Sequence, residues 1–247
     1  MQVSFFSDLH IKFPGDEASN LVENLFNNPY FLKSSHVIFL GDIFDILIGE
    51  HDQYFDRYDV FFKGILNLLE RGIKVTYLEG NHDFHVKNSM ESFFRKNSHH
   101  SHLFEYKKEG FYLEISGKNY YVCHGDEVDY TNEAFKRWKN IYTSRPFQIL
   151  VNNIVPYKMI KLIGDRASQN SKSRGSKTFD YSHAKQKYRE GAKQLIQEKN
   201  VQGVICGHTH IQENHVYSDG AVYLNSGFPL KDKNFLIVAE TSRFESI

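Results

Sequence analysis

The sequence has few of the features that would assign it to a special class of protein. Two cysteines in 247 residues are too few for a disulfide framework, and no repeat or low-complexity linker stands out. Cys123 and Cys206 lie in apolar runs, so we expect both to be buried. The formal net charge is zero, and no global basic field favours nucleic acid as a partner. The hydrophobic fraction of 40% indicates a globular protein with a sizeable core.

Long uninterrupted hydrophobic segments are also missing. The richest apolar stretch, 147–164, is interrupted by asparagine, proline and lysine, which excludes a membrane-spanning helix. The first ten residues, MQVSFFSDLH, have neither the basic start nor the long apolar run of a secretory signal. We therefore expect a cytoplasmic protein, and peripheral contact with the inner membrane stays open.

Short apolar runs, each ended by glycine, aspartate or asparagine, are typical of buried strands. Helical spacing of apolar residues lies between several of them, at 57–71 with Gly72 as the cap and at 182–199. The alternating run 111–117 is expected to be one arm of a hairpin. The other predicted strands are 2–8, 36–42, 74–81, 119–126, 202–210, 221–227 and 235–240.

This order of elements predicts an α/β (α+β) sandwich of mixed sheets with helices outside. Residues 133–180 contain no strand-like run, and two or three helices are expected there. We interpret 133–177 as a helical cap that is inserted into a main domain formed by 1–132 and 178–247.

Five polar motifs follow predicted strands, at the carboxyl ends where α/β proteins bind ligands. Each motif alone is weak, since a lone GD or GN is an ordinary turn signal. Together they gather carboxylates and imidazoles whose burial requires a counter-charge, which a divalent metal supplies. The motifs are SDLH (Asp8, His10), GDIFD (Asp42, Asp45), GNHD (Asn81, His82, Asp83), HGD (His124, Asp126) and GHTH (His208, His210).

The types of ligand indicate which metals fit. Carboxylates, an amide oxygen and imidazoles without a thiolate suit manganese, iron, zinc or magnesium rather than a structural zinc site. Seven candidate ligands exceed what one ion with an open position needs, so two ions that share one carboxylate fit better. Two metals about 3.5–4 Å apart are a device for in-line displacement at phosphorus.

In their order, the motifs D-x-H, GD-x-x-D, GNHD, a later H and GH-x-H resemble those of the calcineurin-like metallophosphoesterases, over residues 8–210. The resemblance implies a four-layer αββα sandwich and two divalent ions, with Mn²⁺ as the first expectation. One metal would take Asp8, His10 and His210, the other Asn81, His124 and His208, and Asp42 would bridge them. With Asp42 and Asn81, His82 would complete the catalytic set, beside the leaving-group oxygen. Asp45 and Asp83 would orient histidines.

The stretch GHTH is expected to place both imidazoles on the same side of an extended segment, because the strand period is two. Gly207 is expected to let the backbone turn near the metals. One histidine would then serve each ion.

The longer stretch GDIFDILIGEHD (41–52) resembles the UDP-2,3-diacylglucosamine diphosphatases of lipid A synthesis, which also carry a helical insertion after HGD. Those enzymes cleave the pyrophosphate of their substrate to UMP and 2,3-diacylglucosamine 1-phosphate. The chain departs from them in having GNHDF rather than GNRDF, Asn132 and Phe135 where they have aspartate and tyrosine, and a polar stretch, 170–177, that is one residue short. The resemblance implies substrate contacts from Asn81, His82, Asn132, Ser171, Arg174, Lys177 and His208.

The composition of the insertion agrees with a lipid substrate. Its apolar residues are expected to line an acyl groove, and its basic residues to meet phosphates or an anionic membrane. A self-contained helical hairpin with a solvated basic face is the alternative. The apolar set is Phe147, Ile149, Leu150, Val151, Ile154, Val155, Met159, Ile160 and Leu162, and the basic set is Lys158, Lys161, Arg166, Lys172, Arg174 and Lys177.

Other readings stay open at this point. A different phosphoesterase, acting on nucleotides, cyclic nucleotides or phosphoproteins, would carry the same metal motifs, and a scaffold of this fold without catalysis would be expected to lack ligands. The histidines of NSHHSH (97–102) are expected to be solvated surface residues. We expect a monomer or weak dimer that binds a small-molecule lipid nucleotide and no nucleic acid.

Overall fold

Two β-sheets pack face to face between outer helices. The computed structural model describes residues 1–130, 133–163 and 181–247. The first sheet has the strand order β13-β12-β1-β2-β4-β6 and the second the order β10-β11-β9-β8-β7. The strands of the first sheet are β1 (Val3–Phe6), β2 (His36–Phe39), β4 (Lys74–Leu78), β6 (Phe104–Lys107), β12 (Asn234–Val238) and β13 (Ser242–Ser246). Those of the second are β7 (Phe111–Ile115), β8 (Lys118–Val122), β9 (Gly203–Cys206), β10 (Glu213–Val216) and β11 (Val222–Asn225).

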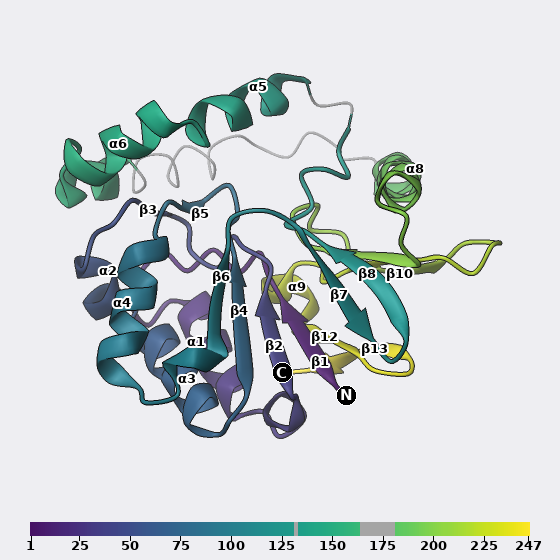
Figure 1. Ribbon diagram of the computed structural model, residues 1–247, viewed down its shortest axis with the longest axis horizontal. Coiled ribbons are helices and arrows are strands. Elements are labelled where there is room, and N and C mark those ends of the chain that lie inside the picture. The colour runs from purple at the N-terminus through teal and green to yellow at the C-terminus, as the bar shows by residue number, and fades with distance from the viewer. Residues whose placement is uncertain (131–132, 164–180) are drawn as a thin grey trace.

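Three hydrophobic cores separate four layers, which confirms the expected α/β sandwich with helices outside (Figure 1). The first lies between the first sheet and helices α1 (Glu17–Asn27), α3 (Asp59–Glu70) and α4 (Lys87–Asn97). The second fills the space between the sheets, and the third lies under α8 (Tyr181–Lys199). Both sheets are therefore covered on both faces, which explains why central strands such as β1, β2 and β9 read as continuous apolar runs.

Strand β2 shows how one apolar run serves two cores. Val37 and Phe39 face the helices, whereas Ile38 and Leu40 face the second sheet, as the strand period of two requires. The hairpin predicted from 111–117 is confirmed, because β7 pairs antiparallel with β8. Both cysteines are fully buried and free, as expected.

The end of α3 confirms the predicted cap. Gly72 adopts a positive φ of 76°, and its N–H donates to Leu69 O at 2.9 Å. The N–H of Ile73 reaches back to Leu68 O at 3.0 Å, which completes a Schellman motif. The helix therefore ends where the sequence indicated.

The strands missing from the sequence prediction are mostly edge or near-edge strands. Among the described residues, β6, β10 and β13 form sheet edges, and their mixed polar composition gives no buried run. A short parallel ladder, β3 (Leu47–Ile48) with β5 (Asp83–Phe84), was also not predicted. Two residues per strand are too few for any periodicity to show.

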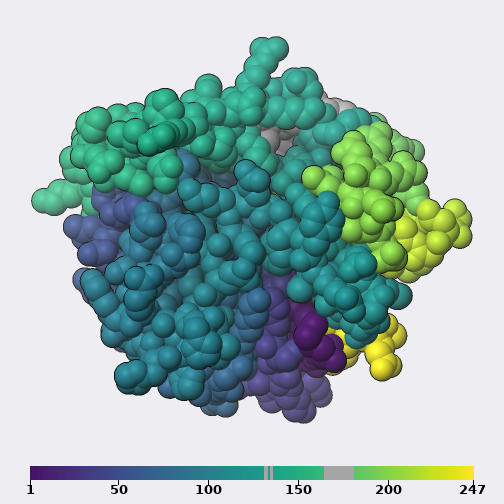
Figure 2. All heavy atoms as spheres, viewed as in Figure 1, coloured from purple at the N-terminus to yellow at the C-terminus, as the bar shows by residue number. Residues whose placement is uncertain are grey.

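The strands that precede the polar motifs all point toward one end of the molecule. In Figure 1 that end carries β3 and β5, with α5 (Glu133–Tyr142) and α6 (Arg145–Asn153) lying across it. Figure 2 shows these helices as a continuous layer over the same end. Residues 133–163 contain no strand, as expected, and 157–163 are helical. Across the described ranges, no helix is both long and apolar enough to cross a bilayer.

A test of the first core uses Gly64, in the middle of α3. A Cβ built there lies 2.2 Å from the ring of Phe26, which is held by its own aromatic neighbours. Gly64→Ala should therefore destabilise the protein by about 1–3 kcal/mol, although alanine is the better helix former. Lys63→Ala, on the exposed side of the helix, should change the unfolding free energy by less than about 0.5 kcal/mol. Urea unfolding measures both, and a stabilised Gly64→Ala would contradict the packing.

Candidate metal centre

The first group of predicted ligands is assembled from both sheets. Asp8 and His10 follow β1, His210 follows β9, and the three offer ligand atoms that all lie within 4.8 Å of one another. His10 Nε2 lies 3.3 Å from His210 Nε2, and His210 Nε2 lies 3.3 Å from Asp8 Oδ1. Asp8 Oδ1 is buried and accepts no hydrogen bond among the described residues. This oxygen is therefore positioned for a cation.

The second group lies directly beside the first. Asp42, His124 and His208 also place ligand atoms within 4.8 Å of one another. His124 Nε2 lies 3.6 Å from Asp42 Oδ2, 3.1 Å from Asn81 Oδ1 and 3.1 Å from His208 Nδ1. His124 Nδ1 donates to Leu40 O at 2.7 Å, which turns Nε2 and its lone pair toward this group.

The distances between the candidate ligand atoms fit binding of several of these atoms to one ion. Two ligand atoms that each lie about 2.0–2.2 Å from one ion are separated by roughly 2.8–3.6 Å at octahedral and tetrahedral angles. The separations of 3.1 Å and 3.3 Å between imidazole nitrogens fall in this range. Neutral imidazoles, carboxylates and an amide oxygen are the donors that borderline and hard divalent metals take. Both groups therefore fit a divalent ion.

The electrostatics of the two groups favour positive charge. Burial would raise the pKa of Asp8 and of Asp42, but the histidines beside them, His210 and His124, lower both pKa values below the usual range. Burial would in turn lower the pKa of His124 and of His210, but the carboxylates raise both. Burial lowers the pKa of His10 to about 4. Each group thus pairs an anionic carboxylate with an imidazole that favours a proton, and a metal ion would supply positive charge in the place of that proton.

The backbone at the predicted ligands is unusual. Asp8, His10, Asp42, His208 and His210 have φ angles of 54°, 53°, 54°, 67° and 55°, in the left-handed region that non-glycine residues seldom occupy. Such conformations cost of order 1 kcal/mol or more each and cluster at functional sites. They persist here because the loops brace each other, with Asp8 N–H donating to Gly41 O and His10 N–H to Asp42 O.

This geometry corrects the expected conformation of GHTH. Strand β9 ends at Cys206, and the two histidines leave it through left-handed backbone rather than an extended segment. His208 reaches the second group and His210 the first, so each group receives one histidine as expected. Gly207 provides space rather than a turn, because a Cβ there would lie 2.1 Å from Ser7 Oγ and 2.3 Å from Asp8 Oδ2.

The carboxylate of Asp83 orients backbone rather than a histidine, in contrast to the expectation. It accepts hydrogen bonds from the N–H groups of Asp42, Ile43 and Gly80 at 2.7–2.9 Å and from Tyr77 Oη at 2.6 Å. Burial and the neighbouring Asp42 raise the pKa of Asp83 to about 6. Asp83 thereby joins the loops that carry Asp42 and Asn81.

His82 projects into the space in front of the first group. Its N–H donates to Asp42 Oδ1 at 2.9 Å, and its Nδ1 donates to the main-chain carbonyl of Asp45 at 2.9 Å. Asp45 thus contacts His82 through its main-chain carbonyl, and its carboxylate offers an oxygen within 4.8 Å of ring nitrogens of His82 and His10. The bond at Nδ1 leaves Nε2 as the atom that can exchange a proton. The rings of His82 and His10 lie 4.9 Å apart.

A cavity of about 760 Å³ opens in front of the first group and reaches Asn81 beside the second, and its volume is within the size range of small-molecule sites. Its polar side includes His10, Asp45, Asn81, His82 and His210. Its other side is apolar and is built by the core and by the helices that lie across this end. The apolar lining among the described residues is Ile46, Ile48, Phe84, Trp138, Phe147, Leu150, Val151, Val155, Ile160, Ile163, Phe228 and Leu230.

The apolar residues predicted for the acyl groove divide into two sets. Phe147, Leu150, Val151, Val155 and Ile160 line the cavity. The other four, Ile149, Ile154, Met159 and Leu162, are 49–67% exposed instead.

Helix α5 is attached to the metal-ligand loops by polar contacts. Lys139 Nζ lies 2.5 Å from the buried Asp126 of the HGD motif, and His85 Nε2 donates to Tyr142 O at 2.6 Å. Trp138, on the same helix, lines the cavity, and sequence reasoning missed it. Its position within an amphipathic stretch after HGD was the available signal.

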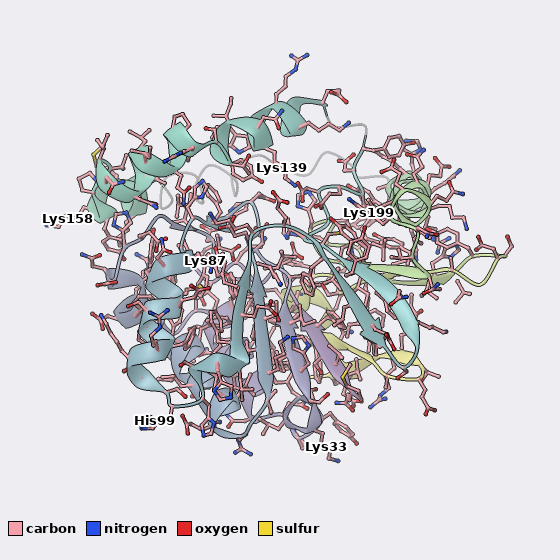
Figure 3. The ribbon with its side chains drawn as sticks, in the orientation of Figure 1. Lys33, Lys87, His99, Lys139, Lys158 and Lys199 are labelled. Carbon is pink, nitrogen blue, oxygen red and sulfur yellow. The ribbon has the colours of Figure 1, made fainter. Side chains whose placement is uncertain are left out.

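Several predicted residues lie outside the site or outside the described ranges. Asn132, Ser171, Arg174 and Lys177, predicted to contact substrate, fall in the undescribed segments, as do Arg166 and Lys172. Phe135 lies on α5, and its side chain is likewise outside the description. The histidines of 97–102 are surface residues, as expected. Figure 3 shows His99 at the end of the molecule opposite Lys139.

Known proteins resemble this chain in sequence and in fold. A family model of calcineurin-like phosphoesterases matches residues 1–212. The chain is 26% identical over 211 residues to a UDP-2,3-diacylglucosamine hydrolase of Histophilus somni (strain 129Pt), covering 85% of each protein. It is 26% identical over 212 residues to a protein of the same name from Neisseria gonorrhoeae (strain ATCC 700825 / FA 1090), covering 85% of this chain and 83% of that protein. A solved structure titled a novel archaeal phosphodiesterase matches with a TM-score of 0.50 at 14% identity, covering 100% of both chains, and supports the fold alone.

From the two groups of candidate ligands we expect two metal ions per chain. Equilibrium dialysis against Mn²⁺ should find two ions per wild-type chain. Asp42→Ala should hold fewer than one, because the carboxylate that we expect both ions to share is removed. His99→Ala is the matched control and should keep both ions, since this histidine is exposed and remote. Full occupancy in Asp42→Ala would refute the shared carboxylate.

Proposed function

The chain belongs to the calcineurin-like phosphoesterase family and is a metal-dependent hydrolase, and on this premise we propose that it cleaves the pyrophosphate of UDP-2,3-diacylglucosamine to UMP and 2,3-diacylglucosamine 1-phosphate. One observation carries the proposal. The cavity is lined by the candidate ligands His10, His210 and Asn81 and by many apolar side chains. A substrate with a charged pyrophosphate and two acyl chains needs both kinds of lining. Two relatives of the chain carry the name of this hydrolase activity.

In this proposal the residues hold two divalent ions. Asp8, His10 and His210 would hold one, Asn81, His124 and His208 would hold the other, and both would share Asp42, whose carboxylate lies beside His124 and His208. Mn²⁺ is the metal we propose, although iron, zinc and magnesium suit the same donors. When bound, such ions polarise the phosphoryl group and lower the pKa of a bound water.

The protein residues contribute orientation and a proton. His82 projects Nε2 into the cavity while its Nδ1 is fixed by Asp45 O, so the ring is held for proton transfer at one atom. We assign it to the leaving-group oxygen, where a proton or a partial positive charge lowers the barrier. Asn81 also lines the cavity and completes the polar side. The apolar wall excludes water from the acyl chains.

The insertion 133–177 acts as a cap with two apolar sides in this proposal. The inner side lines the cavity, and the outer side exposes Ile149, Ile154, Met159 and Leu162 among the described residues. Lys158 lies at the same end of the molecule (Figure 3). Exposed apolar groups beside lysines favour peripheral contact with an anionic membrane, where a diacylated substrate is held. We propose a monomer or weak dimer at that surface.

The principal alternative is a phosphoesterase with a nucleotide or phosphoprotein substrate. A phosphoprotein requires an open cleft, whereas this cavity has an apolar wall of described residues. A scaffold without catalysis is disfavoured by the complete set of candidate ligands.

The substrate is tested by comparing three phosphate esters at fixed Mn²⁺. UDP-2,3-diacylglucosamine should be cleaved to UMP much faster than UDP-N-acetylglucosamine or bis-p-nitrophenyl phosphate, with products identified by mass. Cleavage of bis-p-nitrophenyl phosphate alone would keep the phosphoesterase and reject the lipid substrate. No turnover of any ester by the Mn²⁺-loaded protein would support the scaffold.

Two adjacent residues allow the two sides of the cap to be tested separately. Val155 lines the cavity, and Ile154 is 67% exposed. Val155→Asp should lower kcat/KM for the detergent-solubilised lipid nucleotide by about tenfold or more while sparing bis-p-nitrophenyl phosphate. Ile154→Asp should spare both activities and weaken binding to vesicles of anionic phospholipid. Equal effects of the two substitutions in both assays would refute the assignment of the sides.

The role of His82 is tested with His82→Ala. The variant should retain two Mn²⁺ ions and lose about 10²–10⁴-fold in kcat, because the proton donor is removed but no ligand is. Loss of metal would show that His82 is a ligand instead.

A further inference from the structure

Lys12 lines the cavity beside the candidate metal groups, and none of the motifs includes it. It lies two residues after His10 and shares the cavity with His10, Asp45 and His82. Among the described residues that line this cavity, it is the only lysine or arginine. A cavity that admits an anionic substrate therefore has one permanent cation in its described wall.

The backbone of Lys12 is held on both sides. Its N–H donates to Asp16 Oδ2 at 2.8 Å, and its carbonyl accepts a hydrogen bond from Arg57 Nη2. Asp16 also caps α1 through Ser19 N–H, at 2.7 Å. The preceding residue, Ile11, forms a bridge with Phe44. The side chain thus projects from a fixed point, which reduces the entropy lost when it binds a ligand.

The ammonium group of Lys12 forms no ion pair with a carboxylate of residues 1–130, 133–163 or 181–247. Lys139 and Lys187, by contrast, each pair with an aspartate. The residue is half-buried at the edge of the cavity. A lysine that is fixed at its backbone, lies half-buried at a cavity wall and has no ion pair among the described residues is suited to bind a phosphate.

We propose that Lys12 binds the second phosphoryl group of a pyrophosphate substrate, the one that is not attacked. This inference rests on the proposed phosphoesterase function and defines the substrate class further. The candidate metal groups serve the phosphoryl group that is attacked, and the departing phosphate carries charge of its own. Lys12 neutralises that charge, both in the bound substrate and as the P–O bond breaks and the electron pair passes to the departing phosphate. A phosphate diester with one phosphorus has nothing at this position.

The test measures binding, so it does not depend on turnover. Calorimetric titration of the Mn²⁺-loaded protein, at fixed Mn²⁺, gives dissociation constants for UDP and for UMP, which differ by one phosphoryl group. Lys12→Met should weaken UDP binding about tenfold or more and change UMP binding by less than about twofold. Lys12→Arg should restore most of the affinity for UDP. Lys33→Met is the matched control and should change neither, because Lys33 lies at the opposite end of the molecule (Figure 3).

The outcomes separate this inference from the proposed function. Equal weakening of UDP and UMP, no weakening of either, or no preference of the wild-type protein for UDP over UMP would overturn the role of Lys12. Each of these results is compatible with Mn²⁺-dependent hydrolysis of bis-p-nitrophenyl phosphate by the wild-type protein. Failure of that hydrolysis would reject the phosphoesterase proposal instead.

Discussion

The burial of two carboxylates, Asp8 and Asp42, is the constraint on which the rest of the site depends. Both lie at the ends of neighbouring parallel strands, at 0% and 2% exposure. Uncompensated anions in such a place would cost several kcal/mol each. The surrounding histidines supply positive charge to these carboxylates. The left-handed backbone directs the histidine side chains toward them. The sandwich supplies the rigid support, because its three cores fix the strand ends.

The polar network behind the ligands extends this arrangement. Asp83 accepts four hydrogen bonds of 2.9 Å or less from Tyr77 and from the loops that carry Asp42 and Asn81. A single buried carboxylate therefore sets the distance between ligands from two strands. Helix α5 is attached to the same end through Lys139 and Asp126. The position of the cavity wall is thus linked to the loop that carries a ligand.

The sequence predicted what repeats along the chain and missed what depends on long-range geometry. Buried strands such as β2 have apolar residues on both faces. The polar motifs at their ends can be recognised in the sequence because they directly follow these apolar runs. Edge strands such as β10 bury little and leave no such pattern. The left-handed φ of His208 results from loops that meet across two sheets, so no local signal reports it. Trp138 and Lys12 belong to the cavity only because the fold brings separate segments together.

The most direct test of the account is anomalous scattering from a crystal of the Mn²⁺-loaded protein, measured near the manganese edge. The account predicts two peaks per chain. One lies among Asp8, His10 and His210, the other among Asn81, His124 and His208, and both lie within about 2.0–2.4 Å of an Asp42 carboxylate oxygen. A single peak, or two peaks that do not share Asp42, would contradict it.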